Sequence, residues 1–445
     1  MYVAARNIAE GKGLGSPLIA GLVPGAERRS YVPVVVAKGA FSLWGMLFGF
    51  DLETLRWFNR LLGVSVLCLI FWLGLRAGLS PYLSLLGCLW ISLDTFFQIT
   101  ANIARFDMIS LTFTLLAVHC HLFAEDKKGL WWYFLSGLMV TLALFSHALL
   151  GLFPTLFLSA RLMVQRKIRE FGVWILPLMV SAGIWLALAL DDWFAFTSQQ
   201  QALLRTMTPG SWISPFASFL GFRLIRSDFM PTNSPPWLAV VAVAFLAWKK
   251  GHLLPFFWPA GLPIFCYFLF AFRTHEWYWG WFTPLGYFLF IFFVDRLIKS
   301  GQKTVPVFVL LSAAALWTGY QLFRTGQYLR DVRFISYAHQ QFLEDLSYLL
   351  PNNATILSFA RPDPYFYLQA KRPDVRVYQW PHSGISEDRL RRFLQKVDGT
   401  VMVEPVFNTF IAPFFGPFQT QKRWLLRSAP RAYQPTIYVT RHKNN

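Results

Sequence analysis

Residues whose side chains could carry chemistry stand at the ends of long apolar runs in this sequence. Arg273, His275 and Tyr278 bring a guanidinium, an imidazole and a hydroxyl into one short segment. A guanidinium can bind phosphate through two parallel hydrogen bonds, which a lysine cannot reproduce. The alternative interpretation is a belt of interfacial anchors, because tryptophans alternate through the residues that follow. We favour a mixture, in which the aromatic residues anchor the chain and Arg273 and His275 act in a site.

Other polar positions are weaker candidates. Arg105 and Asp107 stand at the start of an apolar run, where they could form an ion pair that caps a helix or take part in a site. His147 separates two apolar runs, and a lone histidine at such a turn is more often structural. Asp191 and Asp192 could end a helix, act as a base or bind a divalent metal, because paired carboxylates supply hard oxygen ligands. No cofactor is predicted with certainty, and a divalent metal stays open.

Composition indicates that a membrane domain must position these groups. Hydrophobic residues make up 55% of the chain and charged residues only 14%, and the mean hydropathy is +0.41, which excludes an ordinary soluble domain. The formal net charge of +18 could suggest nucleic acid. Many basic residues, however, flank apolar runs, where they set topology and contact anionic lipid headgroups. We therefore expect membrane lipids, and no nucleic acid, as partners.

Apolar runs of membrane-spanning length recur along most of the chain. A helix needs about 20 apolar residues to cross a bilayer, with a lower limit of about 17. The predicted spans are 57–76, 81–98, 107–124, 130–147, 147–163, 172–190, 236–248, 253–272, 277–294 and 305–323. Ten spans return the chain to the side of the membrane on which it began.

The loops between these runs alternate in charge. One set carries the candidate site residues, and the other is rich in Lys and Arg. The basic set is Arg76, Lys127, Lys128, Arg161, Arg166, Lys167, Arg169, Lys249, Lys250, Arg296, Lys299 and Lys303. Basic loops face the cytoplasm by the positive-inside rule, so the candidate site and the C-terminal tail face outward. The sequence therefore predicts an integral protein of the bacterial plasma (inner) membrane that works at its extracytoplasmic face.

The predicted fold class is a polytopic α-helical membrane protein, with about ten spans and a small C-terminal extracytoplasmic α/β domain. Residues 1–56 should form an external loop with interfacial helices, 57–326 the transmembrane domain and 327–445 the α/β domain. Residues 191–235 are expected to form a long external loop. In the α/β domain we expect a first helix ending at Pro351, strands at 354–359, 375–379, 400–404 and 436–440, and a second helix at 386–397.

Short segments of the chain occur in the order found in one family of membrane enzymes. They are Tyr2–Gly13, Tyr31–Pro33, Leu55–Arg60, Ala104–Asp107, Ser146–His147 and Arg273–Tyr278. In these segments the chain resembles the C-type glycosyltransferases that use polyprenyl-phosphate sugars, a superfamily that includes the protein O-mannosyltransferases and the lipid A aminoarabinose transferases. The resemblance covers roughly residues 1–323, and its specificity lies in the order of the motifs. Val32 departs from it, because the aminoarabinose enzymes carry a Lys there; Arg28, Arg29 or Lys38 could supply that charge.

The resemblance implies an inverting transfer of a hexosyl or pentosyl group from a polyprenyl-phosphate donor to a hydroxyl of a lipid, glycan or protein. In this family an Asp of the first external loop accepts the hydroxyl proton, and arginines stabilise the leaving phosphate. The acidic pair that carries this Asp should precede Tyr2. We therefore expect that pair and a first span upstream of Met1, and expect the chain as given to be truncated and inactive.

The resemblance and the residue types together give the candidate site. Asp107 is the candidate catalytic residue within the chain, although an ion pair with Arg105 would lower its basicity. The candidate substrate-binding residues are Arg6, Arg60, Arg105, His147, Arg205, Arg273, His275 and Tyr278.

Two other functions are compatible with lipid-linked sugars. A transporter or flippase would place ionisable groups at mid-membrane and show repeated halves, whereas here the groups gather at one face and no repeat is visible. An O-antigen ligase or polymerase would be expected to carry its main soluble part between spans. This chain carries its soluble part after the last span, which favours the transferase. The transporter or flippase and the ligase or polymerase stay as alternatives to it.

Overall fold

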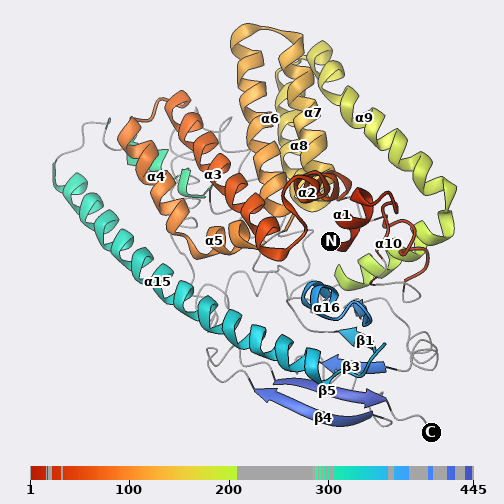
Figure 1. Cartoon of the computed structure of the whole chain (residues 1–445). Coiled ribbons are helices and arrows are strands. Elements are labelled where there is room, and N and C mark those ends of the chain that lie inside the picture. Colours follow the sequence, from red (N-terminus) through yellow and green to blue (C-terminus); the bar gives the residue numbers. More distant parts are fainter. Residues whose placement is uncertain are drawn as a thin grey trace. The chain divides into compact units, whose positions relative to one another are not determined.

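The computed structural model of the chain describes residues 2–16, 18, 23–31, 34–103, 105–207, 304–358, 365–379, 399–403, 418–425 and 436–442, and isolated positions between 284 and 299. These residues form two compact units, which are described separately (Figure 1). The membrane unit comprises Pro33–Asp191 and Met207–Thr325, and the sheet unit comprises Met1–Val32, Asp192–Thr206 and Gly326–Asn445. The expected spans at 236–248 and 253–272, and most of 277–294, lie outside the described residues.

Apolar helices build the described part of the membrane unit. They are α2 Val35–Phe48, α3 Leu52–Arg76, α4 Pro81–Leu93, α5 Thr95–Asn102, α6 Asp107–Lys127, α7 Leu130–Ser146, α8 Ala148–Val164 and α9 Ile168–Asp191. Among the described residues, α3, α6 and α9 are long and apolar enough to cross a membrane, and the bent pair α4–α5 could form a fourth span. Helices α3, α6 and α9 contain the expected spans at 57–76, 107–124 and 172–190. The total of ten spans stays a prediction.

Small residues let the central helices pack closely. A Cβ atom at Gly137 would lie 1.8 Å from the carbonyl oxygen of Trp174, so a glycine is required where α7 meets α9. Ser136 Oγ donates to the carbonyl of Ala117 at 2.9 Å and ties α7 to α6. This bond satisfies a buried hydroxyl that would otherwise be costly in an apolar interior. Helices α6, α7 and α8 accordingly run side by side in Figure 1.

The run expected as one span at 81–98 is broken. Helices α4 and α5 meet at Asp94 with a bend of 68°. Asp94 Oδ1 accepts hydrogen bonds from the backbone N–H groups of Phe96 and Phe97, at 2.9 and 3.1 Å. Asp94 is thus the N-cap of a new helix, and this local capping competes with continuation of α4. The span expected at 81–98 therefore contains a bend at Asp94 that was not expected, and whether the pair crosses the membrane stays a prediction.

Helix α15, Thr304–Leu349, is a single helix of 46 residues. A span at 305–323 and a separate first helix of the α/β domain, ending at Pro351, were expected, but nothing between them breaks the helix. Its glycines, Gly319 and Gly326, have open space around them. Its polar residues fasten it to α4 within the membrane unit: Trp90 Nε1 donates to Thr318 Oγ1 at 2.7 Å, and Thr325 Oγ1 donates to the carbonyl of Leu93 at 2.6 Å. The helix ends before Pro351, as expected.

The sheet unit contains a mixed five-stranded sheet. Its elements are α1 Tyr2–Ala9, α10 Trp193–Met207, α16 Tyr365–Lys371, β1 Thr355–Ser358, β2 Arg376–Gln379, β3 Gly399–Val403, β4 Phe418–Leu425 and β5 Thr436–His442. The strand order is β2-β1-β3-β5-β4, and β1 is parallel to β2 and β3 while β5 is antiparallel to β3 and β4. Strands near the four expected positions are present, whereas β4 was not expected. The helix expected at 386–397 lies outside the described residues.

The N-terminal segment belongs to the sheet unit. Gln199 of α10 accepts a hydrogen bond from the Tyr31 N–H at 2.8 Å and donates to the carbonyls of Pro24 and Arg29 at 3.1 and 3.0 Å. Val3 is buried in the same apolar core as residues of α15, β1, α16 and β2. Residues 193–207 therefore form a helix at the start of the segment 191–235, which was expected as a long external loop.

Candidate functional site

A buried carboxylate stands between two basic side chains at one end of the membrane unit. Arg105 Nε lies 2.9 Å from Asp107 Oδ2, and His147 Nε2 lies 3.6 Å from Asp107 Oδ1. The side chain of Asp107 is 1% exposed and that of Arg105 25%. Asp107 is the first residue of α6, where a negative charge is favoured by the helix dipole. The ion pair expected from sequence is confirmed.

The end of α7 sets the orientation of His147. Ser146 is the last residue of α7, and His147 has an extended backbone before α8 begins at Ala148. The backbone N–H of Leu150 donates to His147 Nδ1 at 3.3 Å. Since Nδ1 accepts this bond, the imidazole proton is assigned to Nε2, which faces Asp107. His147 therefore both caps α8 and contacts the carboxylate.

Two neighbouring residues of α3 hold the loop that carries Arg105. Asn59 is fully buried, and its Nδ2 donates to the carbonyls of Ile103 and Arg105, the latter at 2.9 Å. Arg60 Nε donates to Asn102 Oδ1 at 2.9 Å. Arg60 was a candidate from sequence, whereas Asn59 was not. The sequence feature that could have identified Asn59 is a single amide side chain inside a helix that is otherwise largely apolar.

Lys38 is an unusual residue on the buried side of α2. It is 4% exposed, and its ammonium has no hydrogen-bond partner among the residues that the structure describes. Phe41, one turn later, packs edge-on against Phe58 of α3, the neighbour of Asn59. Helix α2 also packs against α7, and Figure 1 places it at the end of α7 from which α8 starts. Burial lowers the pKa of Lys38 to about 8.

The structure brings Arg60, Arg105, Asp107 and His147 to one end of the membrane unit. Arg6 belongs to the sheet unit, where it contacts Glu10 Oε1 at 2.7 Å and donates to Gln369 Oε1 at 2.9 Å. The other candidates are not tested. The backbone of Arg205 lies in α10 without a described side chain, and Arg273, His275 and Tyr278 fall outside the described residues.

The described residues contain no group of three or more His, Cys, Asp or Glu side chains that could hold a metal ion. Of the aspartate pair considered for metal binding, Asp192 Oδ1 accepts a hydrogen bond from the Ala195 N–H at 3.1 Å and begins α10. Asp191 is the last residue of α9. The two carboxylates thus stand at a junction between helices.

Comparison with solved structures identifies the fold. Two structures of ArnT from Cupriavidus metallidurans, one bound to undecaprenyl phosphate and one in the apo state, match at TM-scores of 0.50 and 0.52. Each match covers 98% of this chain and 92% of that protein, at 12% sequence identity. The chain has the ArnT fold. With this fold and three described helices long and apolar enough to cross a bilayer, it is a polytopic membrane protein. No family model and no curated protein sequence matches the chain.

Proposed function

We propose that the chain transfers a sugar from a polyprenyl-phosphate donor to a hydroxyl acceptor. The observation that carries this proposal is the gathering of Arg60, Arg105, Asp107 and His147 at one end of a helical unit. This unit belongs to a chain with the fold of ArnT, a protein crystallised with undecaprenyl phosphate. The resemblance of the short motifs to C-type glycosyltransferases points to the same chemistry independently of the fold.

Positive charge is the main requirement of this reaction. As the glycosidic bond breaks, the leaving lipid phosphate gains negative charge, which fixed guanidinium groups stabilise without proton transfer. The Arg105 and Arg60 side chains are 25% and 31% exposed, so protein contacts hold them while part of each remains accessible. Lys38 is a third candidate. Its buried ammonium has no described partner, and a phosphate would supply one.

The proton of the acceptor hydroxyl must pass to a base. Asp107 is poorly suited to this step, because its carboxylate is buried and stands between a guanidinium and an imidazole. We therefore propose that Asp107 positions Arg105 and His147. Another acidic group would then accept the proton, as the resemblance to the C-type glycosyltransferases implies. Asp107→Asn separates these roles: a positioning residue should weaken donor binding and turnover together, whereas a base should lower kcat and leave donor binding intact.

A binding experiment tests the phosphate contacts without relying on turnover. Native mass spectrometry would compare the binding of undecaprenyl phosphate and undecaprenol to the purified protein. Arg105→Gln and Arg60→Gln should each weaken phosphate binding by about tenfold or more, since each removes a charge-assisted contact. Arg60 also pairs with Glu53 at 2.6 Å. Arg56→Gln is the matched control, because Arg56 lies one turn earlier on α3 and contacts the same Glu53 at 3.6 Å. Equal binding by all variants would reject the proposed site.

The topology and the acceptor complete the proposal. The loop charges predict that this site and the C-terminal α/β domain are extracytoplasmic, in a bacterial inner membrane. The acceptor is a hydroxyl of a lipid, glycan or protein. Alkaline phosphatase fused after Asn445 should be active, whereas a fluorescent protein fused there should not be. The reverse result would place the site on the wrong side for this reaction.

One observation bears on the transporter alternative. Asp94 is fully buried at the break between α4 and α5, and buried acids in broken helices are common in transporters. Here, however, Asp94 Oδ1 accepts two backbone N–H groups, and Tyr287 Oη lies 3.5 Å from Oδ2. The carboxylate is used to cap a helix, so a structural role accounts for its burial. The transferase is therefore the better-supported proposal.

A further inference from the structure

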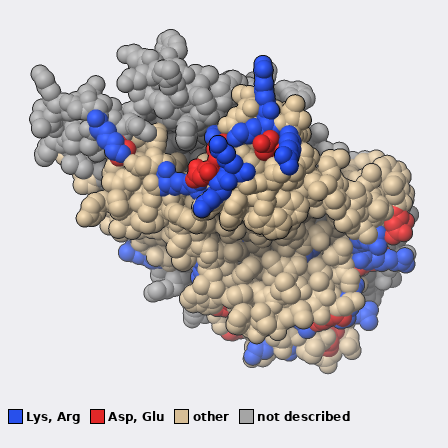
Figure 2. Space-filling model, turned by 90° about the horizontal axis from the view of Figure 1, so that it is seen from above, with Lys and Arg blue, Asp and Glu red and all other residues tan. Residues whose placement is uncertain are grey.

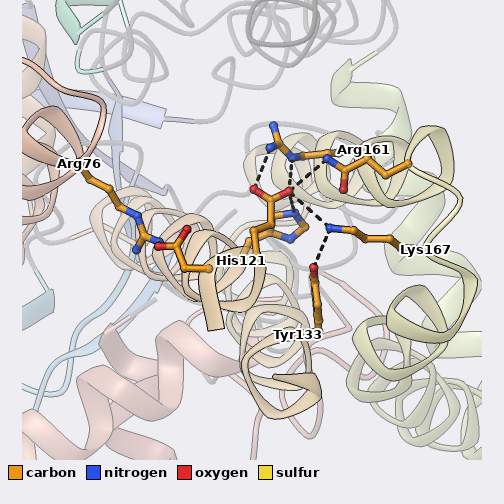
Figure 3. Close-up of polar contacts among 8 residues, drawn as sticks. Arg76, His121, Tyr133, Arg161 and Lys167 are labelled. Atoms are coloured by element: carbon orange, nitrogen blue, oxygen red, sulfur yellow. Dashed lines mark hydrogen bonds and ion pairs between the residues drawn. The ribbon is translucent and has the colours of Figure 1, made fainter. Parts of the chain in front are cut away.

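The helices of the membrane unit carry a second polar cluster at their other end. Helix α6 starts at the Arg105–Asp107–His147 site, and its last turn contains Glu125. Glu125 accepts two hydrogen bonds from Arg161 of α8, from Nε at 3.0 Å and from the terminal nitrogen at 2.8 Å (Figure 3). Lys167, at the start of α9, lies 4.0 Å from the same carboxylate. This cluster, centred on Glu125, ties the α6–α7 turn to the α8–α9 turn.

At this end of the helices, ion pairs and hydrogen bonds between side chains neutralise several of the charges. Lys167 Nζ also donates to the hydroxyl of Tyr133 on α7 at 3.1 Å. Asp126, next to Glu125, pairs with Arg76 at the end of α3. The contacts drawn in Figure 3 therefore connect α6 with α3 and α8, and connect the start of α9 with both α6 and α7. Two of the acids at this end are consequently not available to other cations.

Four cations of the two turns remain outside this network. Lys127, Lys128, Arg166 and Arg169 are exposed, and no ion pair or hydrogen bond of their side chains occurs among the residues that the structure describes. Glu170 is the further carboxylate in this part of the chain. Figure 2 shows Lys and Arg side chains gathered on one face of the molecule around a few acidic ones. These four residues are called the turn cations below.

Apolar side chains stand directly beside the turn cations. Trp131 is 63% exposed, Val164 83% and Ile168 81%. They begin or end the apolar helices α7, α8 and α9, so they are expected at the level where acyl chains meet headgroups. Long basic side chains next to them can reach lipid phosphates while their stems stay in contact with apolar surface. Nucleic acid fits this arrangement poorly, because it offers no counterpart to the exposed aliphatic groups.

We propose that the turn cations form a binding surface for anionic phospholipid headgroups, separate from the site at the other end of the helices. The cluster centred on Glu125 fixes the two turns relative to each other, so that cations from both can contact the same lipid patch. This surface corresponds to the end predicted to be cytoplasmic. The proposal does not depend on the sugar-transfer reaction.

The backbone gives a clean way to remove the charge. Lys128 and Arg166 have φ values of 50° and 55°, a left-handed conformation that glycine adopts without strain. Lys128→Gly and Arg166→Gly should therefore remove two turn cations and relieve strain at both turns. Lys127→Gln and Arg169→Gln complete a variant without the four charges. The control variant neutralises four exposed cations of the sheet unit, namely Arg28, Arg330, Lys371 and Arg376.

Native mass spectrometry of the full chain in mixed micelles would measure the ratio of bound phosphatidylglycerol to bound phosphatidylcholine. The native protein should prefer phosphatidylglycerol, and loss of the turn cations should reduce that preference about tenfold or more, since each cation near an anionic surface adds to the attraction. The control variant should keep the preference. The proposal would be overturned if the variant without the turn cations kept the native preference for phosphatidylglycerol, or if the control variant lost as much of that preference. Thermal unfolding of both variants checks that each remains folded.

Discussion

Replacing Lys38 by Met should make the protein more stable and, by our proposal, weaken its binding of lipid phosphate. Methionine has a similar length, so the packing of α2 is largely kept while the buried charge is removed. Burial lowers the pKa of Lys38 from 10.5 to about 8. A lowering of this size corresponds to roughly 3 kcal/mol, since a tenfold change in proton binding is about 1.4 kcal/mol. The free energy of unfolding should therefore rise by roughly 2–3 kcal/mol at neutral pH.

The pH dependence gives the sign of this effect. The unfolded chain binds the Lys38 proton more tightly than the folded chain does, so the native protein is destabilised by the full amount below about pH 8. Between about pH 8 and 10.5 the penalty shrinks, and above 10.5 it disappears. The advantage of Lys38→Met should thus be large at pH 7 and small near the upper end of this range.

Urea unfolding in detergent micelles, followed by tryptophan fluorescence, would measure the effect at both pH values. Lys12→Met is the matched control, because the Lys12 side chain is 67% exposed and should give no such gain. A loss of stability at pH 7, or an equal gain at both pH values, would refute the electrostatic reasoning. Undecaprenyl phosphate binding is the second readout. A more stable Lys38→Met protein that binds the lipid normally would remove Lys38 from the phosphate site.

Three further perturbations follow from the same structure. Asn59→Ala should lower the free energy of unfolding by roughly 1–3 kcal/mol, because two partly buried carbonyls lose their donor. Denaturant titration would measure this loss, and an unchanged midpoint would contradict it. Glu125→Gln should lower the free energy of unfolding by roughly 2–3 kcal/mol, because it weakens the charged hydrogen bonds from Arg161. If adding Arg161→Met to this variant restores stability, that result would support this cause. Hydrogen bonds from Arg372 and a backbone N–H hold the pKa of Asp374 well below its usual value of 3.8, so its stabilising contribution is present above that pH and is lost on acidification. Asp374→Asn should therefore show a smaller loss of melting temperature below about pH 4 than the native protein, and parallel curves would argue against it.

Much of the helical architecture could be predicted because hydropathy and chain breakers act locally. The charge at Asp107 and the polar Ser146–His147 break mark helix ends that the structure contains. The bend at Asp94 could not be predicted in this way. One aspartate barely changes the mean hydropathy of a long apolar run, and its effect depends on which backbone N–H groups it caps. Strand β4 was missed for a related reason: it is an edge strand with a mainly polar sequence, and its structure comes from pairing with β5.

The candidate site shows a different limit of sequence reasoning. Sequence identifies cations by type and by position, but it does not tell which of them already has a partner. Arg6 lies in one of the motifs that carry the family resemblance, yet its guanidinium contacts Glu10 and Gln369 in the sheet unit. Lys38 was named from sequence only as one of three residues that could supply the charge of a family Lys, yet it is buried with no described hydrogen-bond partner. Because a buried ammonium without a partner is unfavourable, an anionic ligand would stabilise Lys38 more than it would the described cations that already have one.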